Sequence, residues 1–218
     1  MTAAKKLKTE SKKKLRKFSH LSTRYVADRI LELIYQKRNP HKPWLTPQAC
    51  EILSELVCPE DLVLEFGSGR STRWFSKNVR AVTSIEHSPE WFEIVSEGLR
   101  KDEISNVEFH LVENLPDYAA HADKIIADGS IDIALVDGVA RDACAVVALK
   151  KVRPGGIIVI DDSHRYWPSS SRAPGGLTEG QDTVDKSSSW PEFLTGVSGY
   201  RVLRTSSGVS DTTFFFVT

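Results

Sequence analysis

Short apolar runs alternate with helical patterns through the middle of the chain. The runs lie at 62–66, 81–85, 107–112, 131–136 and 156–160. The last run has four consecutive apolar residues at 157–160, which is typical of a central strand that helices cover on both faces. Strands that alternate with helices form βαβ units, so the pattern predicts a largely parallel and buried sheet.

Helical patterns precede this region. Apolar residues at helical spacing between Tyr25 and Ile34 predict a first helix, which the Asn-Pro pair at 39–40 ends. A second helix is predicted to run to about residue 57, with Thr46 as its N-cap and Pro47 at its first position. Two helices are therefore expected before the first strand.

The C-terminal part has a different pattern. Residues 163–189 are rich in Ser, Gly and Pro and predict a long irregular insertion after the fifth strand. A short helix is expected at 190–194, and runs at 200–204 and 212–217 predict an antiparallel hairpin. We therefore expect an α/β fold with a seven-stranded, mostly parallel sheet, helices on both faces and a C-terminal hairpin.

Composition and charge add limits to this picture. The 218 residues carry 29 basic and 29 acidic side chains, so net charge does not point to nucleic acid or to an anionic membrane. The charge is uneven, however, because lysines and arginines crowd residues 5–17. We expect residues 1–19 to be a disordered basic tail. The alternative is an arm that binds RNA or anionic lipid.

Two further features bear on the cellular compartment. The basic tail is not followed by the apolar run of a secretory signal, and no later run is long enough to span a membrane. The three cysteines are odd in number and lack metal-ligand spacing, which favours reduced thiols. We therefore expect a soluble, cytoplasmic protein.

A glycine turn follows the first predicted strand. In open α/β sheets, ligands bind beyond the carboxyl ends of the strands. Gly67 and Gly69 lie at such an end and allow a sharp turn with a close approach to a ligand. Glu86 ends the second run, 21 residues after Glu65, where a carboxylate can accept two hydrogen bonds from a ribose diol. NAD and S-adenosylmethionine both fit this pattern.

Two residues separate these cofactors. Thr72 occupies the place of the third glycine in the dinucleotide fingerprint. Glu65, directly ahead of the turn, suits the cationic amine of S-adenosylmethionine and would repel a pyrophosphate. The sequence therefore favours the methyl donor over NAD.

These residues resemble a known family. Residues 62–75 look like motif I of the class I S-adenosylmethionine-dependent methyltransferases, and 83–91, with Glu86, resemble the acidic ribose-binding step that follows. The resemblance runs from about residue 46 to the C-terminus, implies a Rossmann-like fold, and departs from the motif at Ser71, where a third glycine is usual. It also implies that His87 lies near the adenine ring and Glu113 or Asn114 near the adenine amino group. The cofactor-binding set expected from it is Glu65, Gly67, Ser68, Gly69, Ser71, Glu86, His87, Glu113, Asn114 and Asp137.

Carboxylates follow the fourth and fifth runs. Asp137 ends the fourth, and Asp161 and Asp162 end the fifth, so adjacent strand ends bring three carboxylates together. They repel one another unless a positive group lies between them, and a divalent cation, Mg²⁺ or Ca²⁺, is the simplest one. The pattern is similar to that of metal-dependent O-methyltransferases of the catechol and macrocin types. That resemblance implies Asp137, Asp161 and Asp162 as metal ligands. The alternatives are that Asp137 only starts a helix and that Asp161 only faces the methionine end of the cofactor.

The remaining expectations concern the acceptor. His164 follows the acidic pair and is a candidate general base beside Asp137 and Asp161. Trp44, Tyr166, Trp167 and Pro168 are expected either to cover the acceptor or to anchor the core. We expect O-methylation of a small molecule or sugar. The alternatives are an RNA or protein methyltransferase that uses the basic tail, an NAD-dependent oxidoreductase, and a non-catalytic module.

From the resemblance we expect one methyltransferase domain at 20–218, preceded by the tail at 1–19. Its parts are N-terminal helices at 20–57, a cofactor-binding core at 58–162, the insertion or lid at 163–189, and the helix and hairpin at 190–218.

Overall fold

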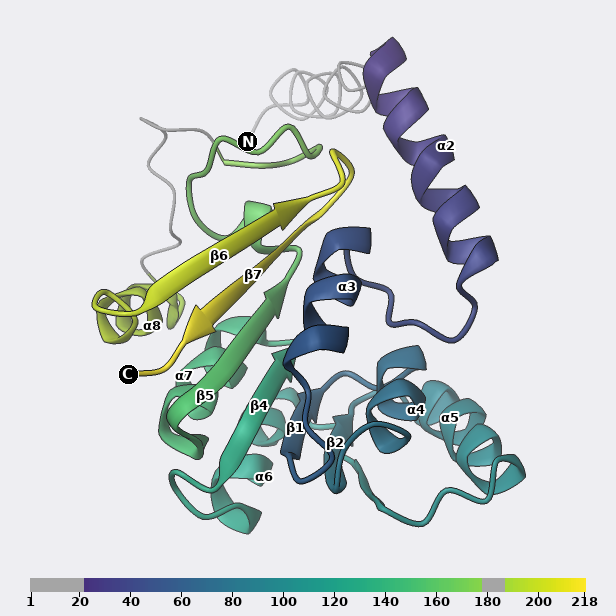
Figure 1. Ribbon diagram of the computed structural model, residues 1–218. Helices are drawn as coiled ribbons and strands as arrows, with labels where there is room; N and C mark the ends of the chain where they lie inside the picture. The colour runs from purple at the N-terminus through teal and green to yellow at the C-terminus, as the bar shows by residue number, and fades with distance from the viewer. Residues whose placement is uncertain (1–21, 178–186) are drawn as a thin grey trace, which may run out of the picture.

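A computed structural model describes residues 22–177 and 187–218, so the basic tail at 1–19 lies outside the described residues. The described chain folds around one twisted sheet, in the order β3-β2-β1-β4-β5-β7-β6 (Figure 1). Five strands are parallel, and β7 pairs antiparallel with both β5 and β6. The predicted seven-stranded α/β fold is confirmed. Its strands are β1 (Leu62–Phe66), β2 (Ala81–Glu86), β3 (Val107–Leu111), β4 (Ile131–Val136), β5 (Val152–Asp161), β6 (Arg201–Ser206) and β7 (Asp211–Phe216).

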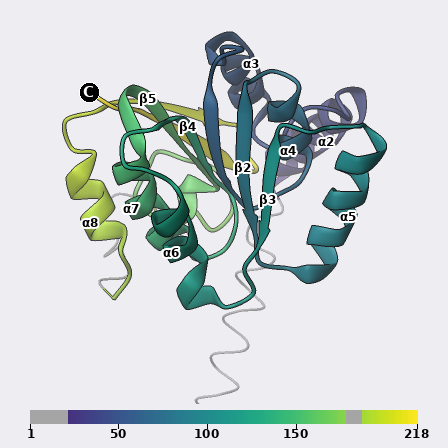
Figure 2. The same cartoon turned by 90° about the horizontal axis from the view of Figure 1, so that it is seen from below.

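Helices cover both faces of this sheet. Helices α3, α4 and α5 lie over one face, and α6, α7 and α8 lie over the other (Figure 2). The apolar side chains of β1, β4 and β5 alternate between two buried clusters, one on each face, which explains the apolar run at 157–160 of β5. The bounds of these helices are α3 (Pro47–Leu56), α4 (Arg70–Ser76), α5 (Pro89–Lys101), α6 (Leu115–Ile125), α7 (Arg141–Lys151) and α8 (Trp190–Gly196).

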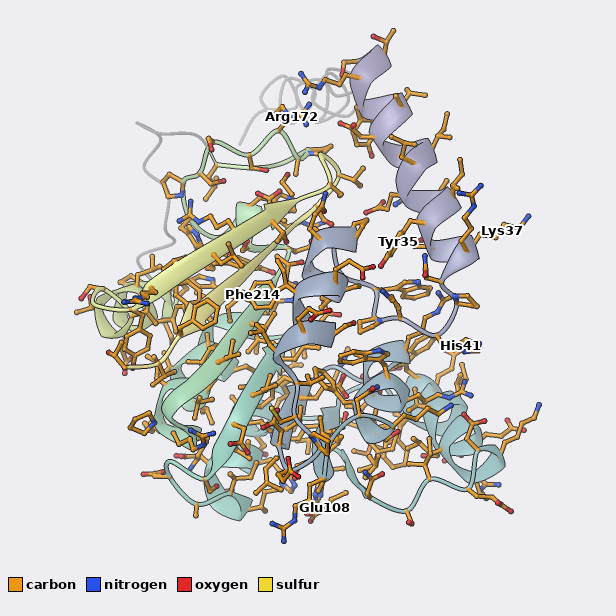
Figure 3. The ribbon with its side chains drawn as sticks, in the orientation of Figure 1. Tyr35, Lys37, His41, Glu108, Arg172 and Phe214 are labelled. Atoms are coloured by element: carbon orange, nitrogen blue, oxygen red, sulfur yellow. The ribbon has the colours of Figure 1, made fainter. Side chains whose placement is uncertain are left out.

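Helix α2 (Thr23–Arg38) lies at the edge of the molecule, where most of its apolar side chains remain exposed. Tyr35 points from α2 toward α3, and its hydroxyl donates to Glu51 at 3.2 Å (Figure 3). The segment between the two helices ends at Thr46, whose hydroxyl accepts from the Ala49 N–H at 3.3 Å and caps α3. The predicted cap of α3 is therefore confirmed. Among the described helices, none has the length and apolar character that crossing a membrane would require.

The segment after β5 begins with a single 3-10 turn, η1 (Ser163–Arg165). Its Trp167 is buried and packs edge-on against Trp190 and Phe215, with ring centroids 5.4 and 5.9 Å away. Tyr166 stacks on Trp190 at 4.6 Å. Of the two roles expected for these aromatic residues, Trp167 has the role of a core anchor. The part of the insertion at 178–186 lies outside the described residues.

Replacing Trp167 by Ala should lower the free energy of unfolding by about 3–5 kcal/mol, because truncating a buried aromatic side chain leaves a cavity. Chemical denaturation measures this loss. Leu203→Ala, at an exposed position of the edge strand β6, is the matched control and should change stability by less than about 1 kcal/mol. A Trp167→Ala protein as stable as the control would mean that Trp167 belongs to a lid.

Candidate functional site

The site lies where the strand order reverses, between β1 and β4. The loops that leave these strands meet there: the Gly67 N–H donates to the Ile85 carbonyl at 2.9 Å, and the Asp137 N–H donates to the Phe66 carbonyl at 2.9 Å. Gly67 has a φ of 91°, and a Cβ there would come within 2.5 Å of the Gly138 nitrogen. Only glycine fits at position 67.

Beneath this loop lies the Glu65 carboxylate, which is 0% exposed. Its Oε2 accepts from the Thr72 hydroxyl at 2.5 Å and from the Ser84 hydroxyl at 2.6 Å, while its Oε1 has no hydrogen-bond partner. Burial raises the pKa of Glu65 to about 7, although the hydroxyl groups of Ser71, Ser84 and Thr72 oppose this rise. In this structure Glu65 braces the loop from below, whereas the sequence analysis expected it to face the cofactor amine.

Thr72, at the place of the missing third glycine, explains how the loop keeps its shape. Its hydroxyl accepts from the Gly69 N–H at 2.9 Å and donates to Glu65. A single side chain thus joins the turn to the buried carboxylate. The sequence analysis treated Thr72 only as a departure from a fingerprint and did not assign it this contact.

Glu86, at the end of β2, lies directly beside the loop. Its Oε2 accepts from the Ser68 N–H at 3.0 Å and from the Ser68 hydroxyl at 2.7 Å. Its Oε1 accepts from the N–H groups of His87 and Ser88 at 2.8 and 2.9 Å. Burial opposes ionisation, but these hydrogen bonds lower the pKa of Glu86 below its ordinary value. The carboxylate is therefore ionised at neutral pH, as an acceptor for ribose hydroxyls must be.

The residues expected at the adenine lie next to Glu86. His87 meets the Tyr118 ring edge-on at 6.1 Å, and its Nδ1 lies 3.0 Å from Glu86 Oε1. Glu113 and Asn114 are both exposed at the turn after β3. The Asn114 amide donates to the Asp117 carboxylate at 2.7 Å. The fold brings His87 and this turn to the same edge of the sheet, because the Val112 N–H donates to the Glu86 carbonyl at 2.7 Å.

Arg141 joins the carboxyl ends of β4 and β5. Its guanidinium donates to the Asp137 carboxylate at 2.8 Å, to the Asp137 and Asp161 carbonyls at 2.7 Å each, and to the Gly138 carbonyl at 2.9 Å. The Asp162 carboxylate lies 3.9 Å from it. The sequence analysis missed Arg141. Its position in the first turn of α7 was the available signal, since a cation there opposes the helix dipole and needs another partner.

The three carboxylates have separate partners. The Thr212 hydroxyl donates to Asp161 at 2.7 Å, and Arg165 pairs with Asp162 at 3.2 Å. Burial raises the pKa of Asp137 to about 6 against the opposing charge of Arg141. Burial and the carboxylates of Asp137 and Asp162 raise the pKa of Asp161 well above its ordinary value. Among the described residues, no three acidic, histidine or cysteine side chains are arranged to hold a metal ion. The positive group between these aspartates is the Arg141 guanidinium.

His164 differs from the exposed histidine that a general base requires. It is 1% exposed, its Nδ1 accepts from the Asp211 N–H at 3.3 Å, and its carbonyl accepts from the Leu177 N–H at 2.9 Å. Burial lowers its pKa. His164 thus packs beneath the chain at 173–177 and the start of β7, and the catalytic role predicted for it lacks the required access.

Comparison with known proteins agrees with this geometry. Residues 64–163, slightly less than half of the chain, match the model of a methyltransferase domain family. No curated protein matches the chain significantly.

Solved structures with a similar fold are distant in sequence. The O-methyltransferase TomG of Streptomyces achromogenes, in complex with SAM, has a TM-score of 0.55 and 20% identity, over 73% of this chain and 74% of that one. The Streptococcus mutans protein SMU.1697c, in complex with SAH, has a TM-score of 0.50 and 13% identity over 76% and 93%. An rRNA methylase of Streptococcus thermophilus has a TM-score of 0.51 and 11% identity over 78% and 94%. The predictions of a methyltransferase and of its class I fold are confirmed.

The buried Glu65 should make stability depend on pH. Below about pH 4.5 the carboxyl is protonated in both states; as pH rises toward 7 the unfolded chain releases this proton first, so the contribution of Glu65 falls by roughly 3 kcal/mol. The Glu65→Gln protein should escape this fall. The measurement is the free energy of unfolding from pH 4.5 to 7.5.

As pH rises, the free energy of unfolding of the wild type should therefore fall relative to that of Glu65→Gln. Glu93→Gln, at an exposed position of α5, is the control and should parallel the wild type. Parallel curves for Glu65→Gln as well would show that Glu65 is not the buried titrating group.

Proposed function

We propose that this chain, a methyltransferase with the class I fold, transfers a methyl group from S-adenosylmethionine to a hydroxyl oxygen of a small molecule. The observation that carries the proposal is the ionised Glu86 carboxylate beside the Gly67–Gly69 turn, at the point where the strand order reverses. A ribose diol requires such an acceptor at the end of the second strand. When bound, S-adenosylmethionine supplies an electrophilic methyl group on a sulfonium.

The chain's own residues suit the cofactor in three places. We assign the ribose hydroxyls to Glu86, and the adenine to His87 and the turn at Glu113 and Asn114. We assign the methionine end to the strand ends between Ser68 and Asp137. Gly67, Gly69 and Ser71 belong to the loop at these strand ends, and Glu65 holds this loop from below through Thr72. NAD is disfavoured by the methyltransferase domain match.

A change in Ser68 accompanies cofactor binding in this proposal. The four acceptor positions of Glu86 are all in use, two of them by Ser68. A ribose hydroxyl can therefore bind only by taking the place of one of these donors, and we assign that place to the Ser68 hydroxyl, whose side chain can turn away. The Trp91 indole, which donates to the Ser68 carbonyl at 2.6 Å, would keep the loop in position during this exchange.

We assign the acceptor proton to Asp137. Its carboxylate lies at the end of β4 and is 29% exposed. Its pKa of about 6 means that it is ionised at neutral pH but can still accept a proton there. A base of this strength can take the hydroxyl proton as the oxygen bonds to the methyl carbon and the carbon–sulfur bond breaks. Asp161, which is buried, would influence the ionisation of Asp137. The positive charge of Arg141 would offset the negative charge of these carboxylates.

Magnesium is not part of the proposal, which revises the expectation for Asp137, Asp161 and Asp162. A hard cation needs several free carboxylate oxygens that converge on one point. Here Arg141, Thr212 and Arg165 each engage one of these aspartates. A bound Mg²⁺ would have to displace the guanidinium that already pairs with Asp137.

A macromolecular acceptor is the second candidate. The observation in its favour is the block of lysines and arginines at 5–17, which lies outside the described residues. An arm of this kind binds RNA through phosphate contacts, with strong salt dependence. Removing residues 1–19 would abolish RNA binding in that case and leave S-adenosylmethionine affinity unchanged.

The first test is calorimetric titration with S-adenosylmethionine. Glu86→Gln should weaken binding by about tenfold or more, because an amide replaces the charged acceptor. Ser68→Ala should retain or increase affinity, because it frees an acceptor position of Glu86. Weaker binding in Glu86→Gln together with unchanged or tighter binding in Ser68→Ala cannot arise from a common folding defect. Equal affinity in the wild type and Glu86→Gln would contradict the proposed ribose site.

The second test is a screen of hydroxylated small molecules for methylation, read by mass spectrometry. With any acceptor found, Asp137→Asn should lower kcat by about 10²–10⁴-fold through loss of the base. The wild-type rate should rise with pH through about 6, as the Asp137 carboxyl ionises. A chelator should leave that rate unchanged. Loss of activity with chelator and recovery with Mg²⁺ would restore the metal-dependent mechanism.

A further inference from the structure

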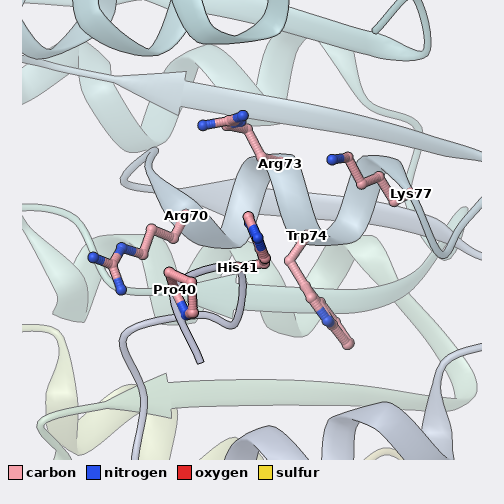
Figure 4. A pocket seen from close by; sticks show the side chains of 6 residues that line it. All are labelled: Pro40, His41, Arg70, Arg73, Trp74 and Lys77. Carbon is pink, nitrogen blue, oxygen red and sulfur yellow. The ribbon is translucent and has the colours of Figure 1, made fainter. Parts of the chain in front are cut away.

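A basic pocket lies on the outer face of α4. It is lined by Pro40, His41, Arg70, Arg73, Trp74 and Lys77, and its volume is about 70 Å³ (Figure 4). The four α4 residues are three or four positions apart, so they share one face of the helix. The other face of α4, with Thr72 and Phe75, is buried against the sheet. Neither Ser68 nor Asp137 lines this pocket.

The cations of this pocket are only partly neutralised. Asp102, at the end of α5, pairs with Arg73 and lies 3.3 Å from the Lys77 ammonium. One carboxylate thus serves two cations, which leaves a net positive charge on this side. Arg70 forms no ion pair within the parts of the chain that the structure describes.

Arg70 is held in a particular way. Its guanidinium lies over the ring of Trp44, 4.6 Å from the ring centroid. Stacking uses the face of the guanidinium and leaves its N–H groups, which point outward in its plane, free to donate. Its Nη1 is shielded from solvent and has no hydrogen-bond partner. A shielded donor without an acceptor costs free energy, which an anionic ligand would recover.

Phosphate is the anion that this arrangement fits. The planar N–H fork of arginine matches two phosphate oxygens, and the remaining oxygens can meet cations from other sides. Arg70 presents such a fork, and Arg73, Lys77 and His41 line the same pocket. Trp74 and Pro40 supply apolar walls that would strengthen these charge interactions.

We propose that this pocket binds the phosphate group of the methyl acceptor, so that the acceptor is a phosphorylated small molecule. Arg70 directly follows Gly69, so one wall of the pocket begins at the loop that we assign to the cofactor. The role of the ligand as acceptor rests on the proposed function, whereas phosphate binding by the pocket does not. Trp44, expected near the acceptor from the sequence, positions Arg70 here.

The test is calorimetric titration of the full chain with inorganic phosphate and with ribose 5-phosphate, at fixed ionic strength. Arg70→Gln should weaken binding of both by about tenfold or more, since it removes a charged, bidentate donor. Arg201→Gln, on the far edge strand β6, removes the same charge and should bind as the wild type does. Asp102→Asn should tighten binding several-fold, because it frees Arg73 and Lys77.

The outcomes separate the two proposals. Loss of phosphate binding in Arg70→Gln would support the pocket. If the wild-type chain binds phosphate but does not bind S-adenosylmethionine, the pocket stands and the proposed function is overturned. Equal weakening in Arg70→Gln and Arg201→Gln would overturn the pocket, since it would indicate only diffuse charge. So would loss of S-adenosylmethionine binding in Arg70→Gln. Tighter binding of a single-stranded RNA oligonucleotide than of ribose 5-phosphate, lost in the same variant, would assign the pocket to nucleic acid instead.

Discussion

The buried carboxylate of Glu65 is the constraint on which the site depends. It lies under the turn after β1, and its bonds to Thr72 and Ser84 join that turn to α4 and to β2. A carboxyl group with no exposure is costly to ionise, and its second oxygen has no partner. The cost falls where the turn after β1 must keep a fixed position relative to α4 and β2. Burial of Glu65 thus lowers the stability of the fold at a loop that must be rigid.

A second electrostatic centre lies at the carboxyl ends of β4 and β5. Three aspartates at neighbouring strand ends would repel one another, and the Arg141 guanidinium lies among them. It also binds the last carbonyls of β4 and β5, so it fixes the backbone as well as the charge. Burial raises the pKa of Asp137 to about 6 against the charge of this guanidinium. One fixed cation therefore serves both the fold and the proposed proton transfer.

The Glu65 centre lies on the proposed cofactor side of the site, and the Arg141 centre lies on the proposed acceptor side. Backbone turns and Glu86 form the cofactor side, where the fold leaves little freedom because Gly67 packs against Gly138. The acceptor side is built from side chains of more distant origin: Arg141 from α7, and Trp44 with Arg70 from the segment before α3 and from α4. Distant structural relatives that share the fold include both an O-methyltransferase and an rRNA methylase. The fold therefore leaves the acceptor to these side chains.

The sequence by itself determined the seven strands, their mostly parallel direction, the C-terminal hairpin and the position of the glycine turn. Apolar periodicity and glycine spacing are local signals. It also located Glu86 and the three aspartates, since parallel strands place their carboxyl ends at one edge. Tertiary structure alone decided what these groups touch. Arg141 lies where the sequence analysis expected a metal cation, Glu65 and His164 are buried, and Trp167 belongs to the core. Burial and charge pairing depend on residues far apart in the chain, which spacing along the sequence does not encode.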